Sequence, residues 1–262
     1  MSQQFRHKKS LAQHFLKSDD IAKKIVDALI PADAAENILE IGPGLGILSK
    51  HLLHLEKNIY FSEIDHRIIS MLKEELKVPE ANIIEGDFLR FNVSDYFKEE
   101  VMVIGNFPYN ISSQILFKVL DHKEKVPVLV GMFQKEMAKR VVAKHGNKVY
   151  GVISLLVQAF YEGEYLFELT PDDFDPPPKI YSAVIRLTRK NTTLNCDEKI
   201  FKQTVKTAFN QRRKKLSNAL SSIPGAKAIL ITLNFADKRA EQLSLDDFIL
   251  LTSAIEKIKQ QF

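Results

Sequence analysis

Apolar residues along the first 190 positions alternate between a helical period and short continuous runs. Ile21, Ile25 and Leu29 recur four residues apart, which is typical of one face of a helix. The next run, NILEIG, is mostly apolar and ends in glycine, which is typical of a buried strand. This run predicts a strand at 37–42, and similar apolar runs predict strands at 58–65, 81–87, 101–106, 126–133 and 182–190. Strands that alternate with crossover helices predict an α/β fold with a doubly wound, mostly parallel, Rossmann-like sheet.

The apolar pattern changes beyond residue 190. The aromatic stretch 149–170 and the strand predicted at 182–190 indicate that 149–190 completes the sheet, and the polar stretch 191–199 is the best candidate for a linker. After it the apolar period is helical, with a clear amphipathic helix at 243–258. We therefore predict an α/β domain over 1–192 and a small all-helical domain over 193–262.

Charged residues are unevenly distributed along the chain. The net charge is only +4, but residues 199–236 contain eight Lys or Arg and no Asp or Glu. Such segregation indicates a basic surface for an anionic partner, and a solvated helix face is the alternative.

Several classes of protein are disfavoured by composition. Cys196 is the single cysteine, so no internal disulfide can form, and no Cys/His cluster has zinc-ligand spacing. We expect no metal. No apolar run approaches the roughly 18 residues of a membrane span, and the basic N-terminus lacks the apolar stretch of a signal peptide. We expect a cytoplasmic protein that does not enter a membrane.

A glycine-rich turn follows the predicted strand at 37–42. Glycines at 42, 44 and 46 allow a ligand to approach the backbone closely, and Glu40 stands two residues ahead of the first. A dinucleotide fingerprint would need glycine at 47, where the chain has Ile47. The spacing is instead typical of S-adenosylmethionine sites, although such turns also occur for structural reasons.

Two acids close the next two predicted strands. Glu63 would accept hydrogen bonds from both ribose hydroxyls, a device that NAD-binding proteins share. Asp87 would accept a hydrogen bond from the amino group of the cofactor's adenine. Since ligands bind beyond the carboxyl ends of parallel strands, we expect the glycine turn and both acids to face one site.

The motif Asn106-Phe107-Pro108-Tyr109 indicates the substrate class. The amino group of adenine is a poor nucleophile because its lone pair is delocalised into the ring. A site that accepts both amino hydrogens, from the Asn106 side chain and the Pro108 carbonyl, favours a localised lone pair and direct attack on a methyl group. Tyr109 would stack on the unstacked base. The alternative is a proline-containing turn with a capping asparagine.

These motifs resemble those of the small-subunit ribosomal RNA adenine dimethyltransferases of the KsgA type, and the resemblance runs the whole chain. The segments that carry it are KSLAQHFL (9–16), EIGPGLGILS (40–49), SEID (62–65), EGDF (85–88), NFPYNIS (106–112), FDPPPKIYSAV (174–184) and FNQRRKKLSNAL (209–220). The resemblance implies transfer of methyl groups from S-adenosyl-L-methionine to two adjacent adenosines of 16S ribosomal RNA, giving N6,N6-dimethyladenosine in an immature small ribosomal subunit. It also implies a methyltransferase domain over 1–192 and a helical RNA-binding domain over 193–262, and we expect a monomer.

The resemblance also implies roles for individual residues. The cofactor would be bound by His14, Leu16, Gly42, Gly44, Glu63, Ile64, Asp87, Phe88 and Asn106. The catalytic residues would be Asn106, Pro108, Tyr109 and Phe174, the last as an aromatic ring near the target base. RNA would be bound by Lys8, Lys9, Arg212, Arg213, Lys214 and Lys215.

The chain departs from the family pattern at three positions. Ala12 replaces the usual glycine, Phe107 the usual leucine, and Ser217 a frequent arginine. Ala12 would tighten the turn before His14, which puts the detailed contacts of His14 in doubt. None of the three removes a polar atom that the chemistry needs.

Other functions are open at this stage. Macrolide-resistance methylases of large-subunit ribosomal RNA usually carry a Gly-Lys-Gly turn where this chain has Leu45 between glycines. A DNA adenine methyltransferase would more often have two prolines before the tyrosine. A non-catalytic ribosome assembly factor would be expected to have lost the acids or Asn106. A nicotinamide dehydrogenase is disfavoured by Ile47 and by the Asn-Phe-Pro-Tyr motif.

Overall fold

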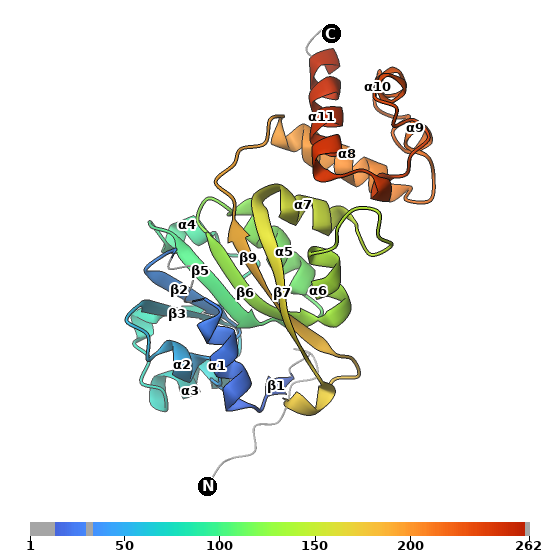
Figure 1. Ribbon diagram of the computed structural model, residues 1–262. Helices are drawn as coiled ribbons and strands as arrows, with labels where there is room; N and C mark the ends of the chain where they lie inside the picture. Colours follow the sequence, from blue (N-terminus) through green and yellow to red (C-terminus); the bar gives the residue numbers. More distant parts are fainter. Residues whose placement is uncertain (1–13, 30–33, 260–262) are drawn as a thin grey trace. The chain divides into compact units, whose positions relative to one another are not determined.

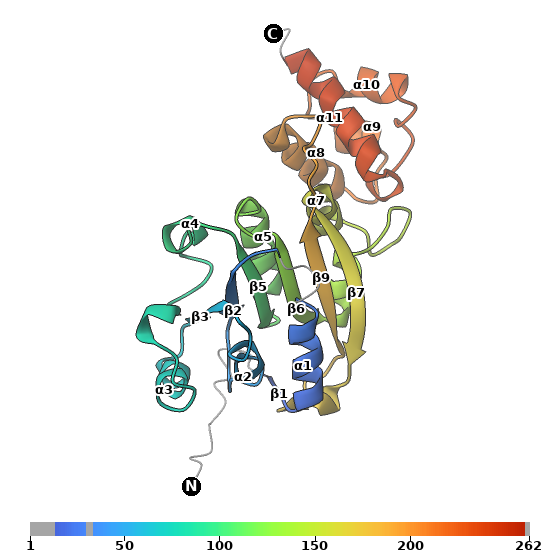
Figure 2. The same cartoon turned by 60° about the vertical axis from the view of Figure 1, so that its left-hand side comes forward.

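The computed structural model describes residues 14–29 and 34–259 of the chain (Figures 1 and 2). The chain divides into two compact units. One contains the part of the chain before residue 139 together with 162–189, and the other contains 139–161 together with the part after 189. The segment 139–161 therefore groups with the C-terminal helices, although two strands of the sheet follow it in the sequence.

A seven-stranded sheet in the order β4-β3-β2-β5-β6-β9-β7 is the framework of the first unit. Its strands are β2 (Asn37–Ile41), β3 (Asn58–Glu63), β4 (Ile83–Glu85), β5 (Val101–Asn106), β6 (Val128–Gln134), β7 (Tyr161–Leu169) and β9 (Ser182–Arg189). The strands from β4 to β6 are parallel, whereas β9 is antiparallel to β6, with Gln134 opposite Ser182. The chain builds outward from β2 in one direction and from β5 in the other. This confirms the predicted doubly wound, mostly parallel fold, with its switch point between β2 and β5.

Some of the helices begin at capping residues that the sequence carries. The Ser18 side chain accepts a hydrogen bond from the Ile21 amide at 3.3 Å, and Asp65 caps its helix in the same way through Arg67 at 3.2 Å. The helices of this unit are α1 (Asp19–Asp27), α2 (Ser49–Leu52), α3 (His66–Glu74), α4 (Val93–Tyr96), α5 (Ser112–Asp121) and the first part of α6 (Lys135–Val141), with 3-10 turns η3 (Glu80–Asn82) and η4 (Pro171–Asp173). A short ladder also joins β1 (Phe15–Leu16) to β8 (Phe174–Asp175).

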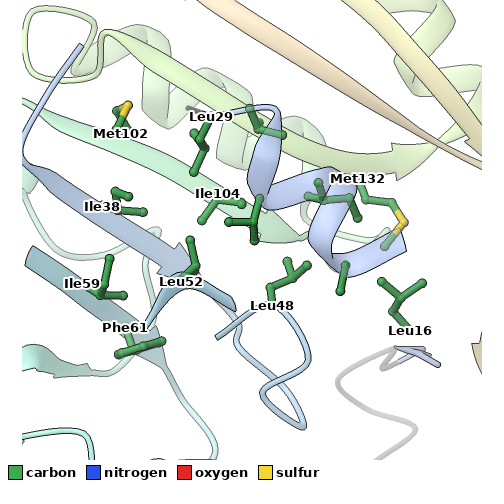
Figure 3. Close-up of a cluster of buried hydrophobic side chains, with 14 of the residues drawn as sticks. Leu16, Leu29, Ile38, Leu48, Leu52, Ile59, Phe61, Met102, Ile104 and Met132 are labelled. Atoms are coloured by element: carbon green, nitrogen blue, oxygen red, sulfur yellow. The ribbon is translucent and has the colours of Figure 1, made fainter. Parts of the chain in front are cut away.

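The main core lies between one face of the sheet and helices α1, α2 and α3. Figure 3 shows side chains of this core, among them Ile38, Ile104 and Met132 from successive strands and Leu48 and Leu52 from the α2 region. All five are at most 2% exposed. Because each fully buried aliphatic side chain contributes roughly 1.5–3 kcal/mol, this face holds the strand ends in fixed positions.

The second unit is helical, as predicted for the C-terminal region. It contains α7 (Val152–Phe160), α8 (Glu198–Asn210), α9 (Leu216–Ala219), α10 (Ala226–Thr232), α11 (Leu245–Lys259) and the 3-10 turn η5 (Ala240–Gln242). Its aromatic core stacks Phe209 on Phe248, with ring centroids 6.1 Å apart, and sets Tyr150 edge-on to Phe209 at the same distance. These contacts join α8 and α11 to the loop before α7.

Helix α7 corrects part of the prediction that 149–190 completes the sheet. Strands β7 and β9 do complete it, whereas residues 152–160 are helical. The sequence VISLLVQAF is buried on nearly all sides, so it has no polar face and no helical period to read. A continuous apolar run of this length is compatible with a strand or a helix.

Candidate active site

A cavity of about 260 Å³ lies beyond the carboxyl ends of β2, β3, β4 and β5. This is the edge of the sheet at which its strand order reverses, where doubly wound folds bind ligands. The cavity belongs entirely to the first unit. All of the cofactor residues predicted from the sequence line it: His14, Leu16, Gly42, Gly44, Glu63, Ile64, Asp87, Phe88 and Asn106. Pro108 and Tyr109 line it too.

The glycine turn after β2 forms one wall of the cavity. Gly42, Gly44 and Gly46 have φ values of +67°, +55° and +75°, which side chains rarely adopt. A Cβ at Gly44 would lie 3.0 Å from the Phe15 ring, whereas one at Gly42 would meet no atom within 4 Å. The turn thus brings bare backbone to the cavity and leaves space in front of Gly42.

Two buried carboxyl groups also line the cavity. Glu63 is 6% exposed, and its Oε1 accepts hydrogen bonds from the amides of Ile64 at 2.7 Å and Asp65 at 2.9 Å. Burial raises the pKa of Glu63, and those backbone N–H groups oppose the rise. Glu40 is 1% exposed, accepts a hydrogen bond from Ser49 Oγ at 2.6 Å, and has its pKa raised to about 8 by burial.

Asp87 and Phe88 follow β4 on another wall of the cavity. Asp87 Oδ1 accepts a hydrogen bond from the Leu89 amide at 2.9 Å, which fixes the carboxylate in a local turn. Phe88 is 4% exposed and meets Phe91 edge-on at 5.2 Å. An acceptor and an aromatic side chain are therefore presented side by side to the cavity.

Asn106, the last residue of β5, is oriented by the N-terminal segment. Its side-chain nitrogen donates a hydrogen bond to the His14 carbonyl oxygen at 2.8 Å. Because a carbonyl can only accept, this contact fixes which end of the amide faces His14. The amide oxygen of Asn106 is consequently left for another donor.

Tyr109 is held on two sides. Its hydroxyl lies 2.5 Å from Ser182 Oγ, and its ring stacks on that of His14 with centroids 5.5 Å apart and planes inclined by 27°. The His14 ring is itself held by a 2.7 Å contact between Nδ1 and the Pro176 carbonyl oxygen. Burial raises the pKa of Tyr109, so the phenol is neutral at physiological pH. The side chain is thus held in place by contacts with Ser182 and His14.

Phe107 fits its position because two neighbouring strands carry glycine. It is fully buried and meets Phe133 edge-on at 5.1 Å. A Cβ at Gly131 would lie 2.2 Å from the Phe107 ring, and one at Gly105 would lie 2.7 Å from it. The departure from the usual leucine is accommodated by these bare strand positions.

Phe174 is the one predicted catalytic residue that the structure does not bring to the cavity. It is 1% exposed, pairs with Leu16 in the short ladder between β1 and β8, and belongs to the hydrophobic core. Its apolar ring gains more from burial there than from exposure to water. The sequence did not single out Ser182, the first residue of β9, whose hydroxyl lies 2.5 Å from that of Tyr109.

The predicted RNA-binding residues of the second unit differ from one another. Arg213 and Lys214 are exposed. Arg212 donates to the carbonyl oxygens of Asn147 and Lys148, and so holds the exposed loop 144–148. Lys215 forms an exposed ion pair with Asp237 at 2.7 Å. Lys8 and Lys9 lie outside the described residues.

The family model for ribosomal RNA adenine dimethylase matches residues 4–257 of the chain. The chain belongs to this family. It is 50% identical over 252 residues to the ribosomal RNA small subunit methyltransferase A of Cytophaga hutchinsonii, which covers 95% of this chain and 96% of the relative. It is 47% identical over 253 residues to the protein of the same name from Phocaeicola vulgatus, covering 95% and 89%.

Solved structures agree with this assignment. A dimethyladenosine transferase from Plasmodium falciparum superposes with a TM-score of 0.82 at 26% identity, covering 95% of this chain and 99% of the other. The 23S rRNA methyltransferase ErmE has a TM-score of 0.70 at 21% identity, covering 92% and 99%, and shares the fold.

No helix in the described part of the chain is long and apolar enough to cross a membrane. Within residues 14–29 and 34–259, no group of three or more His, Cys, Asp or Glu is arranged to hold a metal ion.

Proposed function

We propose that this protein transfers methyl groups from S-adenosyl-L-methionine to the N6 amino groups of two adjacent adenosines in 16S ribosomal RNA, giving N6,N6-dimethyladenosine. The observation that carries the proposal is the orientation of Asn106, whose amide nitrogen is bound to the His14 carbonyl at the wall of the cavity. The names of the curated relatives support the small subunit as the source of the RNA.

The lining of the cavity suits the cofactor chemically. Backbone at the Gly42 turn is open to a ligand, Glu63 is an acceptor for ribose hydroxyls, and Asp87 is an acceptor for an adenine amino group. Phe88 and Ile64 supply apolar surface around them, and the exposed half of Ile64 (52%) suits a ligand's ring. When bound, the cofactor supplies an electrophilic methyl group on a sulfonium.

Asn106 and Pro108 hold the amino group that receives the methyl. The Asn106 amide oxygen accepts one N–H of the adenine. The Pro108 carbonyl oxygen accepts the other. This oxygen already accepts a hydrogen bond from the Ile111 amide at 3.1 Å, but a carbonyl oxygen has two lone pairs, so the second is available for the adenine. The nitrogen lone pair is then localised and aimed, so that the rate gain comes from positioning. The methylated amine is acidic and releases its proton to water.

Tyr109 and the basic residues present the RNA to this cavity. The Tyr109 ring, fixed by His14 and Ser182, stacks on the target base, which lies unstacked in an RNA loop. Arg213 and Lys214 bind phosphates in a helical RNA-binding domain over 193–262, adjoining a methyltransferase domain over 1–192. The substrate is the immature small ribosomal subunit, and the enzyme acts as a monomer.

Replacement of Asn106 by alanine tests the proposal. Asn106→Ala removes the acceptor for the adenine amino group, so we expect methyl transfer to fall at least about a thousandfold. Cofactor and RNA dissociation constants, measured by calorimetry and filter binding, should change much less. The matched control is Asn37→Ala, which removes the hydrogen bond that the Asn37 side chain donates to the Glu100 carbonyl oxygen at the amino end of β2. Full activity in Asn106→Ala would refute the proposed role.

A further inference from the structure

Tyr181 is an exposed aromatic residue that the proposed reaction does not use. It directly precedes β9, and 50% of its surface is accessible. Its side chain does not line the cofactor cavity. A tyrosine this exposed adds little to folding, so the ring is available for a partner.

Tyr181 stands close to the catalytic motif. The next residue along the chain, Ser182, binds the hydroxyl of Tyr109 at 2.5 Å, and consecutive Cα atoms are about 3.8 Å apart. The Tyr181 ring lies beside Lys135, the first residue of α6, and not in the cofactor cavity. A nucleotide next to a base held by Tyr109 would lie near the start of β9.

The ring of Tyr181 is fixed in advance by a lysine. Lys135 Nζ lies 5.1 Å from the ring centroid, in a cation–π contact. The same ammonium is held by Glu168 at 2.5 Å, and the Lys135 amide donates to the Tyr181 carbonyl at 2.9 Å. One face of the ring is therefore covered and the side chain is restrained, which lowers the entropy cost of stacking on the other face.

We propose that Tyr181 and Lys135 form a stacking platform for the nucleotide adjacent to the target adenosine. This inference rests on the proposed function, in which two neighbouring adenosines are modified. While one of them reacts in the cavity, the other must be held away from it. An aromatic face beside a cation suits an unstacked base and its phosphate. The platform holds the neighbour outside the cavity, so that only one amino group at a time reaches Asn106.

The test compares Tyr181→Ala with two other variants in methyl transfer to undermethylated small subunits. Tyr181→Ala should raise the KM for RNA about tenfold, the loss of one base stack, with kcat and the cofactor dissociation constant nearly unchanged. Tyr181→Phe keeps the ring and should behave as the unaltered protein. The matched control is Tyr96→Ala, which removes a tyrosine of similar exposure (53%) on α4, ahead of the amino end of β5.

A spectroscopic measurement distinguishes stacking from a general loss of affinity. We would place 2-aminopurine on either side of a target adenosine in a single-stranded RNA and follow its fluorescence at saturating protein. Quenching should be lost in Tyr181→Ala and kept in Tyr181→Phe and Tyr96→Ala. Equal KM values and equal quenching in the two alanine variants would overturn the platform. Absence of methyl transfer by the unaltered protein would instead overturn the proposed function.

Discussion

The cavity of the first unit and the basic segment 212–215 of the second unit are built in different ways. In the cavity, ligand-facing groups are backbone amides, buried carboxyl groups and an oriented amide, each held by a named partner. In the basic segment, Arg213 and Lys214 are exposed side chains, and Lys215 pairs with an Asp237 that is 86% exposed. Binding in the cavity therefore depends on the exact positions of its groups, whereas binding by the basic segment depends mainly on the sum of its charges.

This difference sets the size of the effects that substitutions should have. A buried group that loses its partner costs the full desolvation energy, and an added atom in a packed core has nowhere to go. Exposed ion pairs contribute little individually, because solvent screens them. Arg212 is the exception within the basic segment, since it also holds the loop 144–148 through two carbonyl oxygens.

The largest effect on stability is expected at the glycine beneath Phe107. Gly131→Ala places a Cβ 2.2 Å from the Phe107 ring and 2.9 Å from the Phe133 ring. We expect the free energy of unfolding to fall by about 3 kcal/mol, measured by urea denaturation. Phe107→Leu in the same chain removes the clash and should restore much of the loss. If Gly131→Ala lowered the free energy of unfolding equally in the unaltered protein and in the Phe107→Leu variant, the packing explanation would be contradicted.

A smaller effect, dependent on pH, is expected at Glu40. Burial raises its pKa from 4.5 to about 8, so the folded state keeps a proton that the unfolded chain releases between these values. Its stabilising contribution is therefore complete below pH 4.5 and is lost as the pH rises to about 8, at up to about 1.4 kcal/mol per pH unit. Glu40→Gln should flatten this slope, whereas Glu74→Gln, at an exposed position of α3, should not. If the free energy of unfolding depended on pH in the same way in the unaltered protein and in Glu40→Gln, this role of Glu40 would be refuted.

The smallest effects per residue are expected in the basic segment. Arg213→Gln and Lys214→Gln should each weaken RNA binding and reduce its salt-dependence slope by about one per lost phosphate contact. Lys227→Gln, on α10 in the same unit, is the control for a general loss of charge. Arg212→Gln should in addition lower the melting temperature, because it releases the 144–148 loop. An unchanged salt slope in the first two variants would place the RNA surface elsewhere.

Most of the sheet and of the cavity wall could be predicted from the sequence, because both follow from strand ends. The carboxyl ends of parallel strands meet at one edge, so Gly42, Glu63, Asp87 and Asn106 could be grouped from their positions alone. Their roles in binding and catalysis remain predictions.

Other features depend on tertiary pairing that no local pattern carries. The bond between Tyr109 and Ser182 joins residues 73 apart, and the burial of Phe174 follows from its pairing with Leu16. Helix α7 has no polar face, so no helical period distinguishes it from a strand. The grouping of 139–161 with the C-terminal helices follows from packing and leaves no mark in composition.

The most direct test is methyl transfer from labelled S-adenosylmethionine to undermethylated small subunits, to large subunits and to duplex DNA in parallel, with nucleoside analysis of each product. We predict N6,N6-dimethyladenosine in the small subunit alone. Label in the large subunit or in DNA would contradict the proposed substrate. Cofactor binding without transfer to any of the three would contradict the proposed activity and favour a non-catalytic role in ribosome assembly.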